Sequence, residues 1–114
     1  MKLPPESCLL RIFIGESDKK DGMPLYEALV RDARARGLAG ATVTRGFLGF
    51  GASSRIHTAK VLRLSEDLPV VVEIVDAEEK IQAFLPELDA LIADGLVTME
   101  KVRVIVYRHN GGTT

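Results

Sequence analysis

The 114-residue sequence has one cysteine, two histidines, no tryptophan and no long uninterrupted apolar segment. A single cysteine, Cys8, cannot form an internal disulfide, so nothing in the sequence requires an oxidising compartment. No apolar run approaches the roughly 18 residues that span a bilayer, and residues 1–6 lack the apolar region of a signal peptide. These absences predict a cytoplasmic protein without direct membrane insertion.

An excess of charge of either sign is also missing. Fifteen basic and sixteen acidic residues leave a formal net charge of −1, so no global field would draw the chain onto nucleic acid. Apolar residues make up 46% of the sequence, which indicates a folded globular chain. The length allows one hydrophobic core, so we expect a single domain over residues 1–114, with its core at about 8–108 and flexible ends at 1–7 and 109–114.

Four runs rich in β-branched and aromatic residues are typical of strands, namely residues 8–15, 41–50, 70–75 and 97–107. A weaker alternation at residues 60–64 could add a short strand arm. Gly46 and Gly49 interrupt the second run, which suggests a bulge or a close approach of another backbone.

Apolar residues at spacings of three and four predict two helices. The first is expected from Pro24 to about residue 36, with Gly37 in a left-handed cap. The second is expected to start at Asp76, with Glu79 completing a capping box, and to end at residues 94–95. Pro86 lies inside it and should kink or restart it.

The order strand, helix, strand, strand, helix, strand contains two strand-helix-strand halves. Right-handed crossovers then place both helices on one face of a four-stranded antiparallel sheet. The predicted fold is therefore α+β, a ferredoxin-like βαββαβ sandwich.

Alternation along the strands separates two faces of the predicted sheet. A uniformly apolar set should face the helices: Leu10, Ile12, Ile14, Val70, Val72, Ile74, Val102, Val104 and Val106. The opposite set is Leu9, Arg11, Phe13, Val71, Glu73, Val75, Arg103, Ile105 and Tyr107.

Six of the nine residues in this second set are apolar, whereas a face open to water should be mostly polar. We therefore predict that this set is an oligomer interface covered by another chain. Arg11, Glu73 and Arg103 would form a cross-strand cluster that fixes register. The alternative is that the apolar residues are simply tolerated at the surface.

Residues 46–60 concentrate glycine, hydroxyl groups, basic side chains and a histidine. Backbone N–H groups at glycines, hydroxyls and cations suit an anion, which gives as candidate ligand-binding residues Arg45, Gly49, Gly51, Ser53, Ser54, Arg55, His57 and Lys60. The segment matches neither a P-loop nor a dinucleotide fingerprint. A long hairpin whose glycines serve its turns is an equally good interpretation, although connections of this length tend to be functional.

The sequence contains no catalytic or metal-binding pattern. His57, His109 and Cys8 do not have the spacing of metal ligands, and Ser53 lies in no nucleophile elbow. The acidic residues after the first strand (Glu16, Asp18 and Asp21) alternate with lysines, which is typical of a solvated turn. We predict a non-enzymatic protein without metal or cofactor. An enzyme with His57 in a site between subunits, and a protein that binds divalent copper or zinc, are the alternatives.

Seven short segments together resemble the uncharacterised PII-like family, which is related in fold to nitrogen-regulatory PII proteins. They are Ile14-Gly15-Glu16, Pro24-Leu25-Tyr26-Glu27-Ala28, Gly37-Leu38-Ala39-Gly40-Ala41-Thr42-Val43, Arg45-Gly46, Gly49-Phe50-Gly51, Ile56-His57-Thr58 and Leu68-Pro69-Val70-Val71. The resemblance implies a homotrimer with the sheets facing inward and a long loop between the second and third strands. It also implies a sensor of small metabolites that signals to a membrane transporter or channel.

One departure from the family pattern limits this inference. Nucleotide-binding PII proteins carry a basic, glycine-rich loop before the fourth strand, where this chain has residues 93–100 (ADGLVTME), and only Lys101 and Arg103 beyond it could meet a phosphate. We therefore predict a non-catalytic trimeric regulator that binds a small anionic metabolite or a protein partner through residues 46–60 and the subunit clefts. An adaptor subunit for a transporter or channel, without a metabolite ligand, is the alternative.

Overall fold

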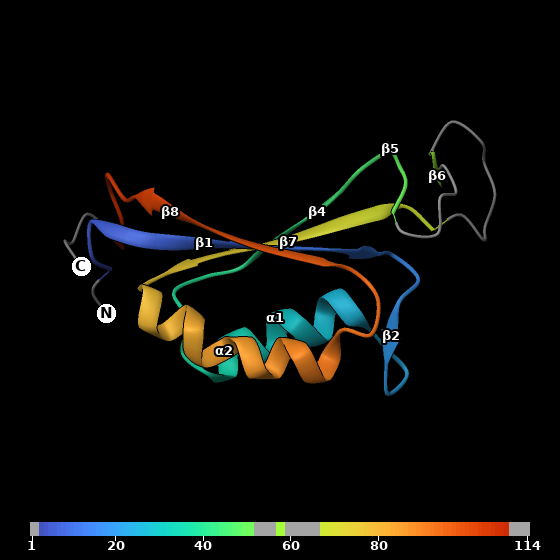
Figure 1. Ribbon diagram of the computed structural model, residues 1–114, viewed down its shortest axis with the longest axis horizontal. Helices are drawn as coiled ribbons and strands as arrows, with labels where there is room; N and C mark the ends of the chain where they lie inside the picture. The colour runs from blue at the N-terminus through green and yellow to red at the C-terminus, as the bar shows by residue number, and fades with distance from the viewer. Residues whose placement is uncertain (1–2, 52–56, 59–66, 110–114) are drawn as a thin grey trace.

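The computed structural model describes residues 3–51, 57–58 and 67–109. A layer of strands lies on a layer of helices (Figure 1). The main sheet contains β4 (Thr42–Arg45), β7 (Pro69–Asp76), β1 (Glu6–Gly15) and β8 (Leu96–Arg103), in that spatial order and antiparallel throughout. Helices α1 (Leu25–Ala35) and α2 (Glu78–Leu91) cover one face of it. This arrangement confirms the predicted α+β, ferredoxin-like fold class.

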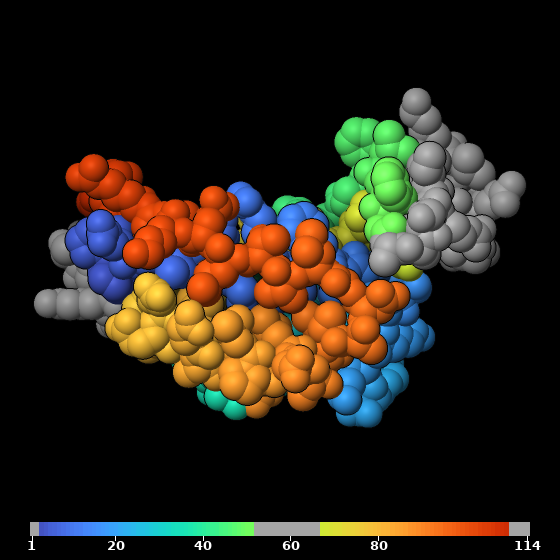
Figure 2. Space-filling view, viewed as in Figure 1, coloured from blue at the N-terminus to red at the C-terminus, as the bar shows by residue number. Residues whose placement is uncertain are grey.

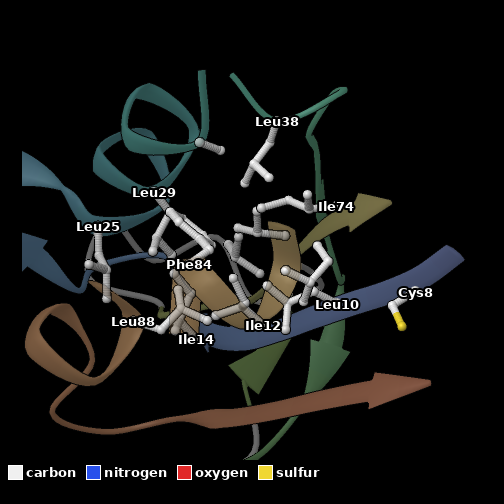
Figure 3. Close-up of a cluster of buried hydrophobic side chains, with 14 residues drawn as sticks. Cys8, Leu10, Ile12, Ile14, Leu25, Leu29, Leu38, Ile74, Phe84 and Leu88 are labelled. Carbon is white, nitrogen blue, oxygen red and sulfur yellow. The ribbon is translucent and has the colours of Figure 1, made fainter. Parts of the chain in front are cut away.

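The core lies between the sheet and the helices (Figure 3). Alternate residues of β1 and β7 and one stripe of each helix supply its buried side chains, which include Leu10, Ile12, Ile14, Val70, Val72, Ile74, Leu25, Leu29, Ala33, Ile81, Phe84 and Leu88. The predicted inward faces of the first and third strands are therefore confirmed.

The end of α1 shows why that helix stops. Gly37 has φ +76°, a left-handed conformation that L side chains rarely adopt. The N–H of Gly37 donates to Arg34 O and the N–H of Leu38 donates to Ala33 O, each at 3.0 Å. These two hydrogen bonds form a Schellman motif at the end of the helix, and Leu38, the residue after the glycine, is buried. The predicted glycine cap is confirmed.

The predicted start of α2 is wrong. Its N-cap residue is Ala77, and Asp76 belongs to β7. The buried Asp76 carboxylate instead accepts hydrogen bonds from Ala77 N at 2.7 Å and from Ala39 N at 2.9 Å. It thereby ties the end of β7 to the loop after α1, a tertiary contact that local capping patterns do not report.

The end of α2 also differs from expectation, and Pro86 does not restart the helix. The helix is not divided at Pro86 but runs without interruption to Leu91, a few residues short of the expected end. Proline removes the N–H that would bond the carbonyl of Gln82. Because Pro86 and Gln82 are both exposed, water can hydrate that carbonyl.

The segment expected to be a simple turn, residues 18–22, belongs to a small β-hairpin. Strands β2 (Lys19–Lys20) and β3 (Met23–Pro24) form a small hairpin with Asp21 at φ +52° and Gly22 at φ +79°. Positive φ at both central positions is the requirement of a type I′ turn. The Asp-Gly pair was the available signal for this hairpin.

The face assignment of the fourth strand is the largest correction. Val102 lies opposite Ser7, Glu100 opposite Leu9 and Leu96 opposite Phe13. Directly paired residues share a face, so the even-numbered residues of β8 lie on the side away from the helices. The prediction assigned these residues to the wrong faces, because an error of one residue in register moves every side chain of a strand to the other face. The strand also ends at Arg103, so Val104 and Val106 lie beyond it, and Val106 is exposed.

Replacing Asp76 by alanine tests the tie between β7 and the α1 loop. Two N–H groups would lose their acceptor, so we expect the free energy of unfolding in urea to fall by roughly 1–3 kcal/mol. Asp89→Ala removes an exposed carboxylate of α2 and should change it by less than about 0.5 kcal/mol. Equal effects of the two substitutions would contradict this role of Asp76.

Candidate functional site

The sheet face turned away from the helices has no covering layer in the described part of the chain (Figure 1). We call it the open face. The strand registers assign to it Leu9, Arg11, Phe13, Thr42, Thr44, Val71, Glu73, Val75, Leu96, Thr98, Glu100 and Val102. It therefore carries apolar side chains from three strands and threonines toward both edges.

A charged network lies at the centre of the open face. Arg11 donates from Nε to Glu73 Oε2 and from Nη1 to Glu100 Oε1, both at 2.8 Å. Glu73 is the direct partner of Arg11 on β7. On β8 the direct partner of Arg11 is Thr98, and Glu100 lies two residues further along that strand, on the same face. The predicted Arg11–Glu73–Arg103 cluster is therefore wrong in its third member, because the register places Arg103 opposite Glu6.

The Arg11 guanidinium of this network keeps its positive charge. The hydrogen bond to Glu73 raises the pKa of the Arg11 guanidinium, the charges of Glu100 and Glu73 raise it further, and partial burial opposes them. A cation whose pKa rises on folding contributes its stabilisation below its unfolded pKa and loses it only at strongly alkaline pH. At neutral pH, one cation thus faces two carboxylates.

The chain beyond β8 does not follow the open face as predicted. Val104 N donates to Pro5 O at 2.7 Å, which continues the pairing with the chain before β1. The Tyr107 hydroxyl then donates to Ala39 O at 3.0 Å, in the loop after α1. Tyr107 is therefore held at the helix layer, whereas Ile105 is 80% exposed.

A protruding segment follows β4. Strand β5 (Leu48–Gly49) pairs with β6 (His57–Thr58), and we call residues 46–51 the arm. Gly46 N donates to Pro69 O at 2.7 Å, and a Cβ atom on Gly46 would lie only 3.0 Å from Pro69 Cγ. The close neighbour of this glycine is therefore the proline ring, rather than another backbone as predicted. In Figure 2 the arm (green) stands out from the surface.

The candidate ligand-binding residues are only partly placed. Arg45 ends β4, and its Nη1 donates to Glu16 Oε2 at 2.7 Å. Gly49 and Gly51 lie in the arm, and the backbone of His57 is opposite Gly49. Four further candidates lie outside the described residues: Ser53, Ser54, Arg55 and Lys60. The anion site at residues 46–60 stays a prediction. The short strand predicted at residues 60–64 lies outside the described residues and also stays a prediction.

A second basic region lies at the other end of the sheet. Pro5, Glu6, Lys101, Val102 and Arg103 line a hollow of about 460 Å³, which we call the basic hollow. The sequence indicated its two cations but not the residues that accompany them. Pro5 and Glu6 join them only through the pairing of β1 with β8.

Other candidate chemistry finds little support in residues 3–51, 57–58 and 67–109. No three His, Cys, Asp or Glu side chains there come together as a metal site. Cys8 is buried as a small apolar residue of the core. No helix in these ranges is long and apolar enough to cross a membrane.

Comparison with known proteins gives the family. Residues 7–104 match the DUF190 family, described as "Uncharacterized ACR, COG1993". A UPF0166 protein of Aquifex aeolicus is 47% identical over 97 residues, covering 85% of this chain and 91% of that protein. A UPF0166 protein of Methanocaldococcus jannaschii is 35% identical over 97 residues, covering 84% and 89%.

The solved structures that resemble this chain are PII-like. CPII, a nitrogen regulatory PII-like protein from Thiomonas intermedia K12, bound to ADP, AMP and bicarbonate, superposes with a TM-score of 0.58 and 19% identity over 87% of this chain and 88% of CPII. A second structure, CPII bound to ADP and bicarbonate, gives 0.53 and 18%, with the same coverage of both chains. At this identity the likeness establishes the fold. The chain therefore belongs to the DUF190 family and has a PII-like, ferredoxin-like fold.

Proposed function

We propose that this protein is a non-catalytic regulator that assembles as a homotrimer through the open face and senses a small anionic ligand in the clefts between subunits. The open face is the observation that carries the proposal. It leaves apolar side chains of β1, β7 and β8 without a covering layer in the described part of the chain. Contiguous apolar surface of this kind marks interaction sites.

The arrangement of the open face supports self-association. Apolar residues flank the Arg11 network on both sides, with Phe13, Val71 and Leu96 toward one end of the sheet and Leu9, Val75 and Val102 toward the other. Each Å² of apolar surface removed from water contributes roughly 25 cal/mol. A closed symmetric assembly buries such a patch on every copy without another component. The resemblance to PII proteins implies three copies.

The ligand class is proposed from charge and from the PII-like neighbours. The ADP, AMP and bicarbonate named for CPII are all anions. This chain presents exposed cations at both ends of the sheet, Arg45 beside the arm and Lys101 and Arg103 in the basic hollow. Glu16 already binds Arg45, so an anionic ligand at Arg45 would have to compete with that carboxylate.

The assembly can be measured by light scattering at micromolar concentration. We expect the wild type to have three times the 12.4 kDa mass of the chain. Phe13→Asp places an unpaired charge among apolar residues, which should cost roughly 3–5 kcal/mol and weaken association a hundredfold or more. Ala83→Asp, on the exposed side of α2, should leave the mass unchanged. A stable wild-type particle of 12.4 kDa would rule out the proposed assembly.

The central network should modulate this assembly through its charge. Glu100→Gln leaves one cation and one carboxylate, so it should tighten association and reduce its dependence on salt. Arg11→Met leaves two carboxylates and should weaken association, most strongly at low ionic strength. Sedimentation at low ionic strength and at about 1 M salt measures both effects. The same response in the two variants would show that the charge of this network does not influence assembly.

Ligand sensing can be tested by thermal shift with ADP, AMP, bicarbonate, phosphate and halides at about 1 mM. A ligand present at 100 times its Kd stabilises the folded state by about 2.7 kcal/mol, so at least one should raise the melting temperature. Arg45→Ala should reduce that shift, whereas Arg34→Ala, at an exposed position of α1, should not. An empty screen with an intact trimer would favour the adaptor role over the sensor role.

A further inference from the structure

A groove lies between the second half of α2 and the start of β8, and we call it the α2–β8 groove. It has a volume of about 220 Å³ and is lined by Leu85, Leu88, Asp89, Ile92 and Val97. Four of these five side chains are apolar, and the exposed Asp89 supplies their one charge. Figure 1 shows β8 running back above α2 after the loop that joins them.

The groove exists because the helix layer ends before it covers β8. Val97 pairs with Ile12 and Met99 pairs with Leu10, so all four side chains lie on the helix side of the sheet. Ile12 and Leu10 are 0% exposed, whereas Val97 is 37% and Met99 40% exposed. The bare apolar surface of β8 therefore lies on the opposite side of the sheet from the open face, and assembly through the open face does not use it.

The groove opens beside the negative end of α2. The last turn of this helix contains Asp89 and no basic residue, although a helix C-terminus carries partial negative charge that cations stabilise. Asp94 follows as an exposed residue of the next loop, and no ion pair joins either carboxylate to another described residue. Lys101 lies four residues along β8 from Val97, roughly 13 Å away and beyond the screening length of about 8 Å. The chain thus supplies no cation to this end of the groove.

We propose that the α2–β8 groove is a docking site for a basic segment of another protein, whose apolar side chain enters the groove while a neighbouring Lys or Arg binds Asp89. Burial of one large apolar side chain supplies most of the affinity. The exposed ion pair adds less, but it selects the sign of the partner's charge. This inference goes beyond the proposed sensing of an anion, which concerns Arg45 and the basic hollow, and it requires neither of them.

The charges argue against other occupants of the groove. Nucleic acid and anionic lipid surfaces are repelled by Asp89 and Asp94. A two-fold contact between the grooves of two copies would bring four such carboxylates together. A neutral segment would fill the apolar wall but would leave the negative end of α2 without a cation. A basic segment with an apolar side chain satisfies both features.

Selection from a phage-displayed library of random peptides on the purified protein tests this surface. We expect the enriched peptides to combine a large apolar residue with a neighbouring Lys or Arg. A fluorescently labelled synthetic copy of the most enriched peptide then gives its Kd by anisotropy. The affinity should fall as salt is raised, because an exposed ion pair is screened.

Two substitutions locate the binding of that peptide. Asp89→Arg reverses the charge at the groove and should raise the Kd about fivefold or more. Val97→Asp places a carboxylate in the apolar wall and should raise it about tenfold. The matched control is Glu79→Arg, which makes the same charge reversal at an exposed position in the first turn of α2, about 15 Å along the helix. It should change the Kd by less than about twofold. Thermal melting checks that each variant is folded.

The inference is overturned by a library that yields no enriched peptide, by enriched peptides that are neutral or acidic, or by equal effects of Asp89→Arg and Glu79→Arg. An assembly larger than a trimer that Asp89→Arg disrupts would assign the groove to a second copy and would also overturn it. The mass of the wild type and the screen of anions are separate measurements. The docking surface and the proposed sensor function can therefore fail independently of each other.

Discussion

The pairing of β1 with β7 on one side and β8 on the other is the constraint on which the rest of the structure depends. It places alternate residues of β1 in the core and the residues between them on the open face. The same pairing brings Glu73 and Glu100 to Arg11 from two different strands. The central network exists because β1 has a neighbour on each side.

A single layer of helices leaves this sheet with two unequal faces. One face is buried by α1 and α2, and the other presents apolar residues around a charged network. A network with one cation and two carboxylates limits how readily that face can be desolvated, because an unbalanced charge is costly to bury. Assembly through the open face would therefore combine a strong apolar attraction with an electrostatic opposition set by Glu100.

Sequence patterns predicted the fold well where the signal is local. The alternation of β1 and β7 identified their buried residues, and Gly37 marked the end of α1 because its left-handed conformation favours glycine. Local patterns failed where a distant contact decided the outcome. Asp76 looked like a helix cap, but its carboxylate binds the loop after α1 as well as Ala77. For the candidate anion site, the sequence supplied the candidate residues, and the structure places the backbones of Arg45, Gly49 and His57 at one end of the sheet.

The sequence by itself determined the class of fold, the order of its strands and helices, the inward faces of the two central strands and the family resemblance. These features follow from periodicity, glycine placement and short motifs, which are properties of neighbouring residues. Only the tertiary structure decided which face each residue of β8 occupies, and hence that Glu100 rather than Arg103 binds Arg11. The physical reason is that β8 is an edge strand with apolar residues on both faces, so its own alternation does not define its register. Hydrogen bonding to β1 defines it, and a shift of one residue reverses every side chain.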